Sequence, residues 1–151
     1  MRKILLAVDG SDHANRATEL AGELSAGLDA IVDIVHVVPD RDLVPVHVHP
    51  FVANYTQLEE TYNTRRNLLE ESGHRMVFEA AETIRESGGQ VGSEEILFGR
   101  PDQEIASKAD RSEVDFIVMG RRGLGEVKGL FMGSVSTRVG QLSEKTLVTT
   151  E

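Results

Sequence analysis

The chain has no cysteine among its 151 residues, and it is short of basic side chains. Without cysteine there are no disulfides, no thiol catalysis and no thiolate metal sites, a composition compatible with a reducing cytoplasm. Lys and Arg number 16 against 25 Asp and Glu, which gives a net charge of −9. Because affinity for a nucleic-acid backbone depends mainly on clustered cations, the composition argues against a general nucleic-acid binder.

Long apolar runs are also missing. The run at residues 4–8 follows Arg2 and Lys3, but it stops at Asp9 and is too short for the core of a signal peptide. No segment approaches the length of a membrane span, so we expect a cytoplasmic protein without membrane insertion. The length suits a single domain, residues 1–151, with a core that needs no covalent cross-links.

Signals for strands and helices alternate along the chain. Short runs rich in Val, Ile and Leu predict strands at 3–8, 30–38, 91–98, 114–119 and 147–148. Helical spacing predicts a helix after a Ser11 cap, a long helix over 55–86, a helix beginning at Pro101, and a last helix over 133–142. This alternation predicts an α/β fold, an open parallel sheet with helices on both faces.

Irregular features interrupt this pattern. The segment after Pro39, up to residue 54, is charged and contains proline and histidine, which indicates an irregular insertion. Within it, His47 and His49 alternate as ligands on a metal-binding strand do, but no carboxylate pair is near, so a metal site is disfavoured. Gly73 is a candidate bend or break in the long helix, and residues 93–95 interrupt the third strand.

A glycine-rich loop follows the fourth predicted strand, from Gly120 onward. Glycine lets backbone N–H groups turn toward an anion, and the pair Gly133 and Ser134 would open the last helix, whose positive end attracts phosphate. The loop also carries three cations on an acidic chain, namely Arg121, Arg122 and Lys128. Ordinary turns use glycine too, so glycine content alone leaves phosphate binding and a simple turn about equally favoured.

The loop is not a P-loop. It never reads Gly-Lys-Ser/Thr, so the lysine and magnesium chemistry of P-loop NTPases is absent in that form. Ser11, Ser134 and Ser136 have no recognisable base arrangement, and capping or phosphate contact explains them better than nucleophilic catalysis. Binding is therefore better supported than rapid hydrolysis, while a weak ATPase stays open.

The carboxyl ends of the strands are where an open parallel sheet binds ligands. Asp9 leaves the first strand, where its carboxylate can accept hydrogen bonds from ribose hydroxyls or an adenine amino group, or simply form the turn before the helix. Val37 offers an apolar surface that suits an adenine ring and is equally ordinary in a core. For His36, a hydrogen-bonded structural role is favoured.

Four ordered blocks of the chain resemble the universal stress protein family, in its ATP-binding branch. The blocks are residues 3–11, 36–38, 99–101 and 120–136, the last with the spacing of Gly120, two residues, Gly123, nine residues, then Gly133 and Ser134. The resemblance covers nearly the whole chain. It implies a Rossmann-like fold whose five-stranded parallel sheet has the order 3-2-1-4-5.

The resemblance also implies an ATP site. Its nucleoside part would be held by Asp9, Val37, Met119 and Gly120, and its phosphates by Gly123, Gly133, Ser134, Val135 and Ser136. Family members vary at Arg121 and Arg122, so phosphate contacts from these two residues are inferred from their charge alone. Many members have a proline just before the final strand, whereas this chain has Thr146.

The function that the resemblance implies is that of a cytoplasmic ATP-binding stress-response or regulatory protein, a homodimer through its C-terminal strand at 146–150. Binding of ATP, with or without Mg²⁺, would adjust the conformation of the homodimer or its contact with a regulatory protein partner, which is unidentified. One alternative is a nucleotide-dependent enzyme, a slow ATPase or an adenylyl transferase, although no Ser-Gly-Gly-x-Asp-Ser or His-x-Gly-His element is present. Another is a nucleotide-free dimeric interaction module, which the intact spacing from Gly120 to Ser134 disfavours.

Overall fold

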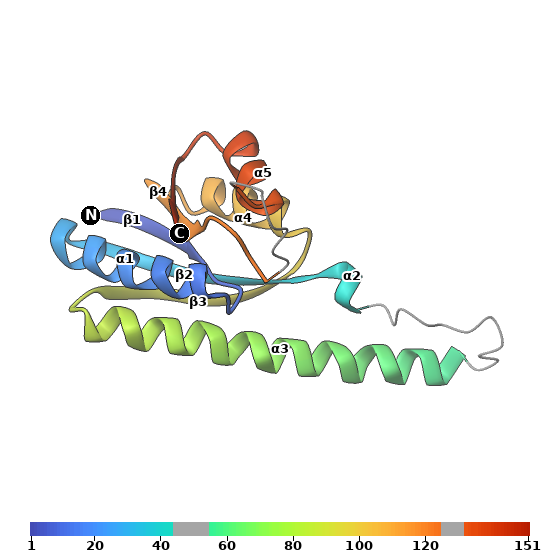
Figure 1. Cartoon of the computed structure of the whole chain (residues 1–151). Coiled ribbons are helices and arrows are strands. Elements are labelled where there is room, and N and C mark those ends of the chain that lie inside the picture. Colours follow the sequence, from blue (N-terminus) through green and yellow to red (C-terminus); the bar gives the residue numbers. More distant parts are fainter. Residues whose placement is uncertain (44–54, 125–131) are drawn as a thin grey trace.

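The structure, a computed structural model, describes residues 1–43, 55–124 and 132–151. Its centre is a five-stranded sheet in the order β3-β2-β1-β4-β5, in which every neighbouring pair is parallel (Figure 1). The strands are β1 (Arg2–Ala7), β2 (Ala30–Pro39), β3 (Gln90–Gly99), β4 (Phe116–Gly120) and β5 (Thr146–Thr150). The predicted fold class and strand order are confirmed.

Helices cover both faces of this sheet. On one face lie α1 (Asp12–Leu28) and α3 (Tyr55–Glu86), and on the other lie α4 (Pro101–Arg111) and α5 (Ser134–Leu142) (Figure 1). Strand β1 is buried on both sides, with Ile4 and Leu6 in the core beneath α1 and α3, and Leu5 in the core beneath α4 and α5. Burial on both faces explains why β1 reads as an unbroken apolar run rather than an alternating one.

The start of α1 is fixed by the predicted cap. The Ser11 hydroxyl accepts a hydrogen bond from the Ala14 N–H at 3.2 Å, and Asp12 lies in the first turn. The buried positions of α1 are all small, among them Ala14, Ala17 and Ala21, so the helix can approach the sheet closely. This capped turn follows β1 directly and holds the carboxyl end of that strand in place.

Helix α3 is continuous through Gly73, so a break at this glycine was a wrong prediction. A Cβ atom at residue 73 would lie 2.8 Å from His36 Cδ2 and 3.0 Å from Ile96 Cδ1, distances that real Cβ atoms avoid. Glycine is needed here because the helix passes so close to β2 and β3. Its role is packing against the sheet and not helix termination.

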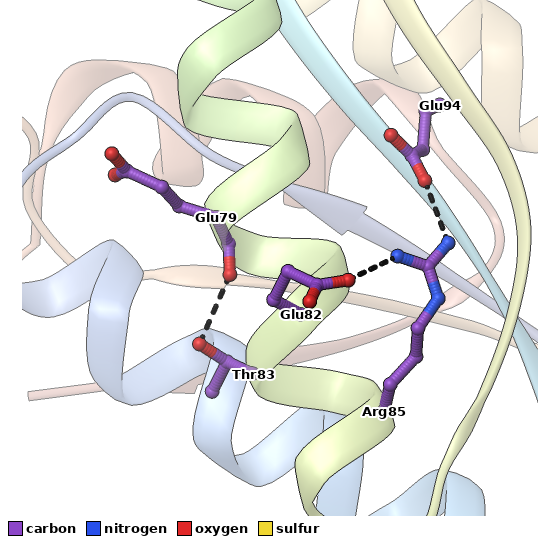
Figure 2. A network of polar contacts seen from close by, with 5 residues as sticks. All are labelled: Glu79, Glu82, Thr83, Arg85 and Glu94. Atoms are coloured by element: carbon purple, nitrogen blue, oxygen red, sulfur yellow. Dashed lines mark hydrogen bonds and ion pairs between the residues drawn. The ribbon is translucent and has the colours of Figure 1, made fainter.

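An ionic network ties the C-terminal end of α3 to β3 (Figure 2). The Arg85 guanidinium donates to Glu82 at 2.8 Å, one turn earlier, and to Glu94 of β3 at 2.9 Å. These hydrogen bonds to the two carboxylates raise the pKa of Arg85 above its ordinary value. The network lies on the surface, so we expect it to fix the orientation of α3 more than to add stability.

Other predicted boundaries need correction. Residues 40–43, predicted as irregular, form the short helix α2 (Asp40–Leu43), while the rest of that segment, with His47 and His49, lies outside the described residues. The predicted interruption of β3 is a shift in its register with β2 between Val32 and Ile34, and the strand continues. Strand β4 begins two residues later than predicted, because Val114 still donates its N–H to Ala109 of α4.

Candidate functional site

A pocket of about 560 Å³ lies at the carboxyl ends of β1, β2 and β4. We call it the strand-end pocket. All eleven residues predicted for the ATP site line it, namely Asp9, Val37, Met119, Gly120, Arg121, Arg122, Gly123, Gly133, Ser134, Val135 and Ser136. A smaller hollow of about 250 Å³ between α1 and α3 contains none of them. The fold therefore brings together four segments that are far apart in the sequence.

One half of the strand-end pocket is apolar. Beside Val37 and Met119 it is lined by Leu69 and Met76 of α3 and by Ile105 of α4. The sequence did not identify these three helical residues as site residues, because their spacing is the spacing of any core-facing helix position. Such a wall suits a flat, weakly polar ring system.

The other half is built from the loop after β4, whose glycines have identifiable packing reasons. A Cβ atom at Gly120 would lie 2.8 Å from His13 Cβ and 2.9 Å from the Ala14 nitrogen, so any side chain there would collide with the first turn of α1. At Gly123, a Cβ atom would collide with Asp9 Oδ2. These two glycines let the loop lie against α1 and the Asp9 carboxylate.

The backbone of Arg121 holds the loop between β5 and α5. Its N–H donates to the Thr150 carbonyl at 2.8 Å, and its own carbonyl accepts from the Gly133 N–H at 2.8 Å. The Ser136 hydroxyl, in a residue only 2% exposed, donates to the same carbonyl at 2.7 Å. The Ser136 side chain therefore fixes the loop, and what this residue can offer an anion is its backbone N–H.

The N-terminus of α5 faces the strand-end pocket without a cap of its own. Its N-cap residue, Gly133, makes no side-chain hydrogen bond, and the first turn contains no acidic residue. By contrast, α1 and α4 carry acids in their first turns. The N–H groups of Ser134 and Val135 belong to the set that no helix can satisfy internally, so this end of the pocket favours an anion.

The two arginines of the loop differ in their surroundings. Arg121 has a carboxylate partner, since its Nη1 lies 2.6 Å from Oε1 of Glu151. The Nε of Arg122 is buried and has no hydrogen-bond partner among the residues that the structure describes. A buried N–H without a partner is costly, and because the Arg121 guanidinium is already paired with Glu151, Arg122 is the better candidate for an anion contact. Lys128 lies outside the described residues.

Asp9 and His36 are held by hydrogen bonds to backbone groups. Asp9 Oδ1 accepts from the Ser11 N–H at 3.0 Å, so this carboxylate forms the predicted turn and also lines the pocket. His36 Nδ1 lies 2.8 Å from the Val8 carbonyl, which confirms the hydrogen-bonded histidine. Because a carbonyl only accepts, this Nδ1 carries the proton.

A buried carboxylate that the sequence did not reveal lies behind the pocket wall. Asp102, only 6% exposed, accepts from Arg100 at 2.9 Å and lies 3.5 Å from Arg138 of α5. Burial raises the pKa of this carboxyl, but the hydrogen bond and charge of Arg100 and the contact with Arg138 outweigh it, so the pKa lies below its ordinary value. The contact with Arg138 joins α4 to α5 next to Pro101, a pocket residue.

Within residues 1–43, 55–124 and 132–151, no three His, Cys, Asp or Glu side chains are grouped so that they could hold a metal ion. In the same ranges, no helix has the length and apolar character needed to cross a membrane.

Comparison with known proteins agrees with the fold and the motifs. The model of the universal stress protein family matches residues 1–150. The chain belongs to the universal stress protein family. It is 33% identical over 143 residues to the universal stress protein YxiE of Bacillus subtilis, covering 93% of each chain. It is 35% identical over 139 residues to a universal stress protein of Thermus aquaticus, covering 91% of this chain and 90% of that one.

Solved structures share the architecture. The structure of MJ0577, a universal stress protein of Methanocaldococcus jannaschii, matches 99% of this chain and 94% of its own with a TM-score of 0.82 at 26% identity. Two more distant universal stress proteins were solved with nucleotides. One is in complex with cAMP (TM-score 0.69, 22% identity, 99% and 97% covered). The other, from Archaeoglobus fulgidus, is in complex with dAMP (TM-score 0.66, 21% identity, 100% and 98% covered).

Proposed function

We propose that this universal stress protein binds an adenine nucleotide, ATP in particular, and acts as a cytoplasmic regulator in a stress response. Nucleotide occupancy would adjust the conformation of a homodimer or its contact with a regulatory protein partner. The observation that carries the proposal is the strand-end pocket, which has an apolar half and a half built from glycines, cations and a helix N-terminus. The complexes of fold relatives with cAMP and dAMP support adenine as the base.

The two halves of the pocket suggest how the nucleotide would lie. The adenine ring would occupy the apolar half, against Val37 and Met119 and facing α3. Asp9, at the boundary between the halves, keeps its second carboxylate oxygen beside Gly123, where it would accept hydrogen bonds from ribose hydroxyls. The phosphates would then extend along the loop to the start of α5.

The charges favour a ligand with several phosphates over a nucleoside. The first N–H groups of α5 and the Arg122 guanidinium, whose Nε is buried, are separate groups of donors that line the pocket and would attract an anion. Each would stabilise one part of a phosphate chain through charge-assisted hydrogen bonds. Mg²⁺, where it takes part, would enter bound to the phosphates of ATP, as is usual for this ion.

Mass spectrometry of ligand released from the purified protein, together with calorimetric titration of ATP, AMP, adenosine and GTP, tests the proposal. We expect ATP among the released ligands and a preference for ATP over both adenosine and GTP. A protein that carries no nucleotide and binds none would contradict the proposal and leave the dimeric interaction module. An adenylated protein, or rapid phosphate release during titration, would instead favour the enzyme.

A further inference from the structure

In the half of the strand-end pocket that is built from the loop after β4, the cation Arg121 is paired with Glu151, the residue that follows β5. Arg121 Nη1 lies 2.6 Å from Glu151 Oε1, and the Arg121 side chain is 14% exposed while that of Glu151 is 79% exposed. Arg121 also lines the strand-end pocket. A surface carboxylate therefore meets the charge of an arginine that belongs to the proposed ATP site.

Backbone contacts hold residue 151 in this place independently of its side chain. The Arg16 Nε donates to the backbone oxygen of Glu151. One residue earlier, the Thr150 hydroxyl donates to the His13 carbonyl at 2.8 Å, and the Thr150 carbonyl accepts from the Arg121 N–H at 2.8 Å. The end of β5 is thus fastened both to α1 and to the loop, which keeps the Glu151 carboxylate beside the loop.

We propose that Glu151 is a specificity-determining residue, a built-in competitor that lowers the affinity of the site for ligands rich in phosphate. The inference rests on the proposed function, since it concerns the same site. A guanidinium already paired with a carboxylate has much of its charge neutralised, so a phosphate must displace Glu151 or tolerate its repulsion. The penalty grows with the number of phosphate charges and is absent for adenosine.

The direction in which ATP affinity changes when Glu151 is removed distinguishes a competitor of the phosphates from a residue that positions Arg121. If Glu151 merely oriented Arg121 for the ligand, its removal would weaken ATP binding. A side chain that is 79% exposed keeps many rotamers and is a poor support for a neighbour, whereas its negative charge acts in every rotamer near the loop. Removal of the charge is therefore expected to strengthen ATP binding.

The test compares Glu151→Gln with Glu144→Gln in calorimetric titrations with ATP, AMP and adenosine. Glu144 is an exposed acid between α5 and β5, so both variants change the net charge by the same amount. Glu151→Gln should bind ATP about two- to fivefold more tightly, AMP with a smaller gain and adenosine unchanged, and the ATP gain should shrink as salt is raised. Glu144→Gln should match the parent for all three ligands.

A second comparison asks whether Glu151 acts through Arg121. In an Arg121→Gln background, the gain from Glu151→Gln should fall to less than half of its value in the parent. The competitor role would be overturned if Glu151→Gln bound ATP no more tightly than the parent, or if its affinity for adenosine rose by the same factor. In either case, ATP binding by the parent would still support the proposed function. Failure of the parent to bind ATP would overturn both.

Discussion

Gly133 is the residue at which the phosphate assignment can be tested most directly. Its backbone has φ −71° and ψ 158°, an extended conformation open to any residue, and it is the uncapped N-cap of α5. In Gly133→Asp, the new carboxylate would cap α5 and occupy the place proposed for phosphate. We expect ATP affinity to fall at least about tenfold, about 1.4 kcal/mol, with the fold retained. Titration calorimetry and thermal unfolding measure the two effects.

The matched control is Gly133→Asn, which has nearly the same shape without the charge. Both side chains meet the same crowding, because a Cβ atom at residue 133 would lie 3.1 Å from the Arg121 carbonyl oxygen. A difference between the two variants therefore reports charge at the phosphate position. If the folded Asp variant binds ATP as well as the Asn variant, the phosphates do not lie at the start of α5.

Arg122 separates recognition of charge from the shape of the loop. Its buried Nε, without a partner in the described part of the chain, predicts a direct phosphate contact. Arg122→Gln should weaken ATP binding about tenfold and adenosine binding much less, because only ATP carries the charge that the guanidinium meets. Parallel titrations decide between three readings. Equal losses would indicate a distorted loop, and no loss would remove Arg122 from the site.

Asp102 predicts a pH dependence of stability. Its pKa is lower in the folded chain than in the unfolded one, so its contribution is present above the unfolded pKa and is lost as pH falls through the folded value. Asp102→Asn should therefore lower the melting temperature at pH 7, and the difference from the parent should narrow below about pH 4. A constant difference between pH 7 and pH 3 would show that Asp102 acts by packing and not by charge.

At the scale of helices and strands, Gly73→Ala is expected to change the melting temperature in the direction opposite to the one that helix propensity predicts. Alanine favours a helix interior over glycine by about 1 kcal/mol, yet at residue 73 its Cβ would lie 2.8 Å from His36. Gly73→Ala should therefore lower the melting temperature. Gly27 of α1 is the control, because nothing lies within 4 Å of a Cβ there and alanine should raise the melting temperature slightly. Stabilisation at both positions would contradict the close packing of α3 on the sheet.

The elements that the sequence predicted are those whose signal is local. Apolar runs identified every strand, because a strand buried on both sides of the sheet is apolar throughout. A cap residue identified the start of α1, because the free N–H groups of a helix start favour a serine there. The contribution of α3 and α4 to the pocket was not predictable in this way. Leu69, Met76 and Ile105 have the spacing of core residues. In the sequence Asp102 is an ordinary acid of a first helical turn, and only the structure shows that Arg138 of α5 lies beside it.

The candidate site divides along the same line. Nine of the eleven predicted site residues came from the family motif, and Arg121 and Arg122 came from their charge. Neither source showed that Gly120 and Gly123 are required by α1 and by Asp9, or that the Ser136 hydroxyl is used within the loop. These roles depend on contacts across more than ten residues of sequence. A motif specifies which residue types recur, whereas the contacts explain why each is needed.

For the whole molecule, the two edges of the sheet differ in a way that bears on dimerisation. Edge strand β3 carries Glu94 and Glu95, paired with Arg85 and Lys108 respectively, and charges of this kind discourage pairing with another chain. Edge strand β5, residues 146–150, contains only Thr, Leu and Val. We therefore retain the prediction that two copies pair through β5 about a two-fold axis. One self-complementary contact would then cover the β5 edge of each copy.

The direction of the backbone groups decides which proline substitution tests this interface. The Thr150 carbonyl accepts from Arg121, so Thr150 points its backbone groups toward the β4 side, and by the two-residue period Val148 does the same. Leu147 and Thr149 then present theirs to the free edge. Thr149→Pro should remove an outward N–H and shift the dimer toward monomer, whereas Val148→Pro would remove an N–H of the internal ladder with β4 and leave the outward groups in place. Analytical ultracentrifugation at micromolar concentration measures the shift, and circular dichroism checks the fold. A monomeric parent, or a folded Thr149→Pro variant that stays fully dimeric, would exclude β5 as the interface.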